Sequence, residues 1–118
     1  MIRSYEDIEA YQLAYQGSLE IHKLSLTFPK HEMQELGSQI RRSTKSIAMN
    51  IAEGYGKRIS IAEFKRFLLI AIGSCDEVRV QLDYSRDLDY ISKEQHSALK
   101  ERYNQIGKML HGLYRNWK

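Results

Sequence analysis

The chain has 118 residues, of which 42% are hydrophobic and 28% are charged, and its formal net charge is +3. This balance is typical of one folded domain covering residues 1–118 and excludes a disordered chain. The single cysteine, Cys75, excludes an internal disulfide framework and favours a reducing compartment, and no apolar run reaches the roughly 18 residues that a membrane-spanning helix needs.

The first two predicted helices are bounded by capping and helix-breaking residues. One covers about residues 5–28: Ser4 is a suitable N-cap residue, and the only proline follows directly after the segment. The next begins at about residue 32 and ends at Ala52 or Gly54. We expect Gly54 and Gly56 to adopt the left-handed backbone conformation that ends a helix.

The two later helices each begin with a capping box. Ser60 and Glu63 start a helix that continues to about residue 88, and Ser92 and Gln95 start one that reaches the C-terminus. Seam residues at spacings of three and four follow in both segments: Phe64, Phe67, Ala71, Cys75, Val78, Leu82 and Ser85, then His96, Leu99, Tyr103, Ile106, Leu110, Leu113 and Trp117. Because the connections are short, we expect an all-α, antiparallel up-down-up-down four-helix bundle.

Two glycines fall in the middle of the third and fourth helices. With the intervening turn near Tyr90, Gly73 and Gly107 lie level with each other. We expect them to face each other and let the two backbones approach closely; the alternative is two unrelated glycines.

Polar residues share one face on each of the two middle helices. They are Arg42, Ser46, Asn50 and Glu53 on the second helix, and Ser74, Glu77 and Gln81 on the third. A turn near residue 58 places Arg42 level with Ser74 and Glu77. We therefore expect a buried or half-buried Arg42–Glu77 pair, with Ser46 and Asn50 completing its hydrogen bonds, that fixes the register of the helices. The alternative is a catalytic or binding site built from the same groups.

Apolar residues cover more than one face of the first helix. Tyr11, Ala14, Ile21 and Phe28 form one stripe, and Ile8, Tyr15, Leu19 and Leu26 form a second beside it. A helix of a lone bundle buries only one stripe, so the surplus favours a subunit interface. Scattered exposed apolar side chains are the alternative.

The residue patterns that metals, cofactors and catalysis require are missing. No histidine has a glutamate three residues before it, as a di-iron bundle site requires, and Gly54-Tyr55-Gly56 does not continue into a phosphate-binding loop. Cys75 lies in an apolar seam, where a small hydrophobic residue is expected rather than a nucleophile. We therefore expect no metal, no cofactor and no enzymatic activity.

Basic residues gather at the end of the bundle that holds the turn between the second and third helices. Residues 1–10, 50–66 and 108–118 contain eight basic and five acidic residues, whereas residues 22–36 and 82–96 at the other end contain four and six. We expect nucleic-acid phosphates to bind Lys57, Arg58, Lys65 and Arg66, with Arg41, Lys108 and Arg115 as secondary contributors. The alternative is an ordinary solvated turn. Tyr55 and Trp117 could stack on bases there or pack in the core.

The motif around the second helix is specific. It runs from Gln39-Ile40-Arg41-Arg42-Ser43 to Asn50-Ile51-Ala52-Glu53-Gly54-Tyr55-Gly56-Lys57-Arg58, and Glu63-Phe64-Lys65-Arg66-Phe67-Leu68 follows it. With these residues the sequence resembles, over nearly its whole length, the bacterial four-helix-bundle family named for proteins encoded in intervening sequences of large-subunit ribosomal RNA genes. Lys45, Cys75 and Asp89 depart from the pattern of the family: a small or apolar residue, leucine and glycine are usual at these positions.

The resemblance implies a cytoplasmic bundle that assembles as a homo-oligomeric ring, often a pentamer. The acidic N-terminal residues, which lack the apolar stretch of a signal peptide, agree with a cytoplasmic location. Related proteins include the accessory factor of diversity-generating retroelements, which binds RNA and a reverse transcriptase. The first hypothesis is therefore a non-catalytic, oligomeric RNA-binding protein, and the second is a protein-interaction scaffold without a nucleic-acid ligand.

Overall fold

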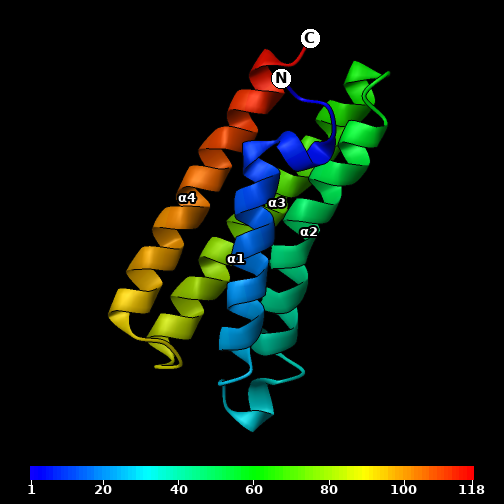
Figure 1. The fold of residues 1–118 in the computed structure, drawn as a ribbon. Coiled ribbons are helices and arrows are strands. Elements are labelled where there is room, and N and C mark those ends of the chain that lie inside the picture. Colours follow the sequence, from blue (N-terminus) through cyan, green and yellow to red (C-terminus); the bar gives the residue numbers. More distant parts are fainter.

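Four antiparallel helices make up most of the computed structural model, which describes residues 1–118. They are α1 (Glu9–Ser25), α2 (Leu36–Gly56), α3 (Ile61–Asp87) and α4 (Lys93–Asn116), with short 3₁₀ helices η1 (Tyr5–Asp7) and η2 (Lys30–Glu32) before α1 and α2. Figure 1 shows both ends of the chain and the α2–α3 turn at one end of the bundle, and the other two turns at the opposite end. The predicted up-down-up-down bundle is confirmed.

Ser4 caps η1 rather than a long first helix. Its hydroxyl accepts a hydrogen bond from the backbone N–H of Glu6, and the Asp7 carboxylate accepts one in return from the backbone N–H of Ser4. Ile8 then adopts an extended conformation, so α1 begins only at Glu9. The prediction of a continuous helix over residues 5–28 was wrong at both ends, because this small cap closes before α1 starts and α1 ends at Ser25.

Gly54 and Gly56 do not end α2 through left-handed backbone, because no glycine in the chain has a positive φ. The helix passes through Gly54, which lies against α3. A Cβ atom at Gly54 would lie 2.6 Å from Phe67 Cβ and 3.0 Å from Phe64 Cδ1. Gly54 is thus a close-packing residue. The left-handed conformation belongs to Asp89, with φ of 64°, in the α3–α4 turn.

The caps of α3 and α4 lie where the sequence predicts them. Both halves of the capping box form at α4: Ser92 Oγ accepts from the backbone N–H of Gln95 at 3.0 Å, and Gln95 Oε1 accepts from that of Ser92 at 2.8 Å. At α3 only one half of the capping box forms: Ser60 Oγ accepts a hydrogen bond from the backbone N–H of Glu63 at 3.2 Å. The Glu63 carboxylate pairs with Arg66 instead.

The two predicted seams form the core. All seven seam residues of α3 are buried, as are the first five of α4, while Leu113 and Trp117 pack against the core half-buried. Each helix contacts its neighbours in the order α1, α2, α3, α4 and back to α1. The diagonal pairs, α1 with α3 and α2 with α4, make no close backbone contact. No helix is apolar over a stretch long enough to cross a bilayer.

Gly73 and Gly107 do not face each other. Gly107 is covered by the Arg79 side chain, whose Nη1 lies 2.9 Å from the position of an added Cβ. Gly73 is exposed, with open space around it, because it lies about half a turn from the α3 seam residues Ala71 and Cys75. The prediction of a glycine contact between α3 and α4 was wrong.

Replacement of Gly54 by alanine tests its packing role. Although alanine is the better helix former, we expect Gly54→Ala to lower the free energy of unfolding by about 1–3 kcal/mol, because Phe67 or the helix must move. Gly112→Ala is the matched control: Gly112 has nothing within 4 Å, and we expect stabilisation of up to about 1 kcal/mol. Urea unfolding measures both. An equal gain for the two variants would contradict the assignment.

Candidate nucleic-acid interface

Four cations surround the start of α3. Lys57 and Arg58 lie in the α2–α3 turn, ahead of the cap at Ser60, and Lys65 and Arg66 lie in the first two turns of the helix. Lys57, Arg58 and Arg66 are exposed, and Lys65 is half-buried. We call these four residues the basic end.

Each cation of the basic end packs against an aromatic ring. Lys57 Nζ lies 5.6 Å and the Arg66 guanidinium 4.5 Å from the centroid of the Phe67 ring. The Arg58 guanidinium lies 4.1 Å from the ring of Tyr55, and Lys65 Nζ lies 5.3 Å from that of Tyr114 on α4. A stacked guanidinium keeps N–H groups in its plane for hydrogen bonds, so these contacts position the cations without consuming all their donors.

An aromatic cluster beneath the basic end closes the bundle. Trp117 meets Phe64 edge-to-face with 4.7 Å between ring centroids, and Tyr55 meets both rings at 6.1–6.2 Å. Tyr55 is 6% exposed. Of the two predicted roles for Tyr55, base stacking is therefore wrong and core packing is confirmed.

Only one carboxylate neutralises the basic end directly. Glu63 Oε2 accepts from Arg66 Nε at 3.1 Å. The hydrogen bond from Arg66 holds the pKa of Glu63 below its usual value, and the charges of Arg66 and Lys57 lower it further. Lys57, Arg58 and Lys65 make no ion pair within the chain. Three uncompensated cations thus remain near the start of α3, where the free amides of the helix also favour an anion.

Arg41 does not belong to this surface. Its Nη1 donates to Ser25 Oγ at 3.0 Å and its Nη2 donates to the Met33 carbonyl at 2.8 Å, at the opposite end of the bundle. Arg41 therefore joins α1 and the loop before α2 to the second turn of α2. Its predicted role as a secondary phosphate contact is corrected to a structural one.

The two basic residues predicted on α4 occupy different places. Arg115 is exposed in the last turn of α4, beside the basic end. Lys108 is exposed at the height of Ile72, roughly 16 Å from the start of α3. It borders a groove also lined by Asp76, which pairs with Arg79, and by Glu101, whose unpaired carboxylate opposes a phosphate there. Arg115 is thus the better placed secondary contributor.

The predicted polar network forms in part. Ser46 Oγ lies 2.9 Å from Ser74 Oγ, and Asn50 Nδ2 donates to the Ser46 carbonyl and hydroxyl at 2.8 and 3.0 Å. These contacts fix the register of α2 against α3. A buried hydrogen bond between the same helices, from Gln81 Nε2 to Ser43 Oγ at 3.1 Å, was not predicted from the sequence.

The expected Arg42–Glu77 pair is not formed. Arg42, Glu77 and Glu53 are all exposed, and no ion pair joins them. Arg42 lies about half a turn from the core residues Ile40 and Thr44, so its side chain follows the outer edge of α2. It borders a small open groove with Glu77 instead of entering the core.

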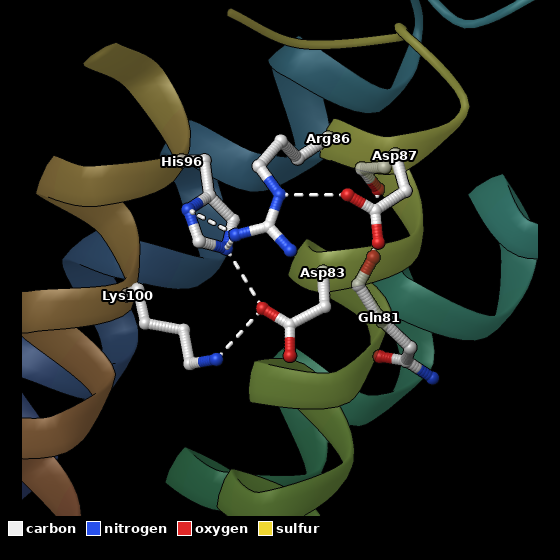
Figure 2. A network of polar contacts seen from close by, with 7 residues as sticks. Gln81, Asp83, Arg86, Asp87, His96 and Lys100 are labelled. Carbon is white, nitrogen blue, oxygen red and sulfur yellow. Dashed lines mark hydrogen bonds and ion pairs between the residues drawn. The ribbon is translucent and has the colours of Figure 1, made fainter. Parts of the chain in front are cut away.

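A second polar network, at the opposite end, was missed from the sequence. Figure 2 shows Asp83 on α3 accepting hydrogen bonds from His96 Nε2 and Lys100 Nζ on α4, both at 2.7 Å. The hydrogen bonds from Lys100 and then His96 lower the pKa of Asp83. Arg86 lies against the His96 ring and pairs with Asp87. The Ser85 hydroxyl beside these residues donates to the Gln81 carbonyl, and the network joins α3 to α4.

Cys75 is a buried core residue, as predicted. Its Sγ donates to the Tyr103 carbonyl at 3.2 Å, and burial raises its pKa to about 11. A thiol held protonated in this way is a poor nucleophile at neutral pH.

The chain is similar to known proteins both in sequence and in fold. A family model described as 23S rRNA-intervening sequence protein matches residues 6–112. The crystal structure of a protein with unknown function from the S23 ribosomal protein family of Bacteroides thetaiotaomicron is similar, with a TM-score of 0.78 and 25% sequence identity. The similarity covers 91% of this chain and 99% of that chain. No curated protein sequence matches the chain.

The neighbouring residues Arg41 and Arg42 make a matched pair for mutation. We expect Arg41→Ala to lower the free energy of unfolding by about 1.5–3 kcal/mol, because two hydrogen bonds from a charged group are lost. Arg42→Ala removes an exposed side chain without a partner and should change it by about 0.5 kcal/mol or less. Thermal unfolding of both variants checks this, and equal losses would refute the structural role of Arg41.

The lowered pKa of Asp83 predicts an acid-sensitive contribution to stability. Because the pKa of the folded protein lies below that of the unfolded chain, this contribution is fully present above pH ~4 and is lost as the pH falls through the folded value. Asp83→Asn should therefore destabilise the protein at pH 7 and flatten the pH dependence of its unfolding below pH ~4. Glu94→Gln, at a carboxylate without an ion pair, is the control. Parallel pH profiles for Asp83→Asn and the unmodified protein would contradict the prediction.

Proposed function

The chain belongs to the 23S rRNA-intervening sequence protein family, and on that premise we propose that it is a non-catalytic, homo-oligomeric protein that binds RNA through its basic end. The observation that carries the proposal is the group of three uncompensated cations, Lys57, Arg58 and Lys65, around one helix start. Phosphate oxygens are the natural ligand of such a group, because each contact releases a condensed counterion from the nucleic acid.

The weakness of a single basic end favours assembly. Three or four cations neutralise few phosphates, and non-specific contacts of this kind have dissociation constants of roughly 10⁻⁴–10⁻⁶ M. A ring whose axis runs along the bundle would place every α2–α3 turn on the same side. Several linked basic ends then bind one RNA with an affinity well above that of one copy. The pentamer expected from the family resemblance is the form we propose.

One residue favours the second candidate function, a scaffold for a partner protein such as a reverse transcriptase. Ile59, between Arg58 and the cap at Ser60, is fully exposed. An apolar side chain at the tip of a basic turn suits a protein partner better than a phosphate backbone. RNA binding measured for the unmodified protein and for Ile59→Ser separates the two functions. RNA binding by the cations predicts the same affinity for both proteins, whereas a role limited to protein recruitment predicts that neither binds RNA.

Charge reversal tests RNA binding directly. We expect Lys57→Glu combined with Arg58→Glu to weaken binding to a structured RNA at least about tenfold and to flatten its salt dependence, because two phosphate contacts become repulsive. Lys30→Glu combined with Lys93→Glu changes the net charge equally at the opposite end, where both side chains are exposed, and should leave the affinity near that of the unmodified protein. Circular dichroism confirms the fold, and filter binding gives the affinity. Equal affinities for a folded Lys57/Arg58 variant and the unmodified protein would end the proposal.

A further inference from the structure

The exposed apolar side chains are distributed unevenly over the bundle. Large apolar residues that are exposed lie on α1, α2, α3, the N-terminal segment and all three connections between the helices: Met1, Ile2, Tyr5, Tyr15, Leu19, Leu26, Met49, Ile59, Ile61, Leu69, Ile70, Val80, Tyr84 and Leu88. None lies on α4. The side of the bundle formed by α1, α2 and α3 is therefore suited to contact another protein surface, and α4 is suited to face solvent.

Two different apolar surfaces lie on that side. The first is a groove between α1 and α2 with a volume of about 320 Å³, in which Tyr15, Leu19 and Met49 are 45%, 43% and 66% exposed. Lys45 lies at its border, with Nζ 3.0 Å from His22 Nδ1. We call it the α1/α2 groove.

The second surface is the outer edge of α3, which we call the α3 ridge. It carries Leu69, Val80 and Tyr84, between 51% and 59% exposed, and Gly73, beside which nothing lies within 4 Å. Gly73 leaves a gap in the ridge wide enough to admit a side chain from outside. Glu77 lies next to the ridge and makes no ion pair within the chain.

The two surfaces match each other when compared at equal height along the bundle. The contacts Ser46–Ser74 and His22–Lys45 fix the heights of α3 and α1 relative to α2. On this scale Tyr15 is level with Leu69 and Leu26 is level with Val80, each within about one residue. Met49 is level with the gap at Gly73, and Lys45 with Glu77, each within about two residues or 3 Å. Apolar residues thus meet apolar ones, and a cation meets a free carboxylate.

We propose that the α3 ridge of one copy of this chain packs into the α1/α2 groove of the next copy, with Met49 entering the gap at Gly73 and Lys45 pairing with Glu77. The inference rests on the proposed function, since it names the surfaces by which the oligomer forms. A closed ring relates its copies by rotation without translation along the axis, so residues at equal height meet. The height match is therefore the arrangement that a ring about the bundle axis requires.

The positions of the two surfaces also permit closure. They are not on opposite sides of the bundle, because α2 lies between α1 and α3 (Figure 1). For helices at the corners of a square, their outward directions differ by roughly 90–135°, which closes a ring of about four to eight copies. In this ring α2 lies toward the axis and α4 on the outside, and the basic ends lie together on one rim.

Paired glycine variants test the interface without altering the core. Gly73 lies on the α3 ridge and Gly112 lies on α4. A Cβ atom added at either glycine would meet no other side chain or neighbouring helix within 4 Å. We expect Gly73→Gln to reduce the mass in solution from that of several copies to that of one chain, and Gly112→Gln to leave it unchanged. Analytical ultracentrifugation without RNA measures the masses, and circular dichroism confirms the fold. An assembled, folded Gly73→Gln protein would overturn the proposal.

Charge exchange gives a second test that depends on pairing. We expect Lys45→Glu and Glu77→Lys each to weaken assembly at least about tenfold, because like charges meet between copies. The double variant should recover the mass, since opposite charges meet again at every interface. Failure of the double variant to recover would overturn the Lys45–Glu77 contact.

These outcomes separate the interface from the function on which it rests. A multimeric protein whose mass does not respond to the variants at positions 73, 45 and 77 overturns the interface and leaves RNA binding by the basic end intact. A single-chain mass for the unmodified protein overturns both the interface and the oligomeric part of the function. If the unmodified protein does not bind RNA but its assembly responds to the variants as expected, the interface is supported and only the role of the basic end is overturned.

Discussion

The close approach of α2 to α3 at Gly54 determines where the charged groups of the basic end lie. Gly54 contacts Phe64 and Phe67 closely enough that no side chain fits between them. Phe67 in turn lies beneath two of the cations, Lys57 and Arg66. Phe64 supports the cluster of Tyr55 and Trp117, which fastens the last turn of α4 to the α2–α3 turn. One glycine contact therefore couples the closing of the bundle to the placement of its charges.

Local sequence signals predicted the helices, and tertiary packing accounts for what they missed. The seams of α3 and α4 and the cap at Ser92 depend on residues within one or two turns, so the sequence alone located them. Gly54 was interpreted as a helix end because glycine often ends helices, whereas here the cause is a contact with α3. Asp83, His96 and Lys100 meet across the α3–α4 turn, and the register used for the glycine pair would have placed them together.

The sequence predicted correctly that four cations lie together at one turn, but it misplaced Arg41. Lys57, Arg58, Lys65 and Arg66 adjoin one turn, so their proximity follows from the chain itself. Arg41 was counted with the basic side of the bundle, but it lies 15 residues, or roughly 22 Å, before the end of α2 at Gly56. The Arg42–Glu77 pair failed for a smaller reason: a position half a turn from the core decides between a buried and an exposed side chain.

The segregation of charge and of apolar surface unites the two proposals. Charge gathers at one end of the bundle because the α2–α3 turn and the end of α4 meet there, and exposed apolar residues gather on the side away from α4. A ring formed through that side would bring the basic ends onto one rim. The salt dependence of RNA binding tests this account most directly, using purified, nuclease-treated protein of known mass and a structured RNA. Four cations of one copy account for a slope of log affinity against log salt of only about −3, so the account predicts a steeper slope for a multimeric particle. A shallower slope, or no binding at low salt, would contradict it.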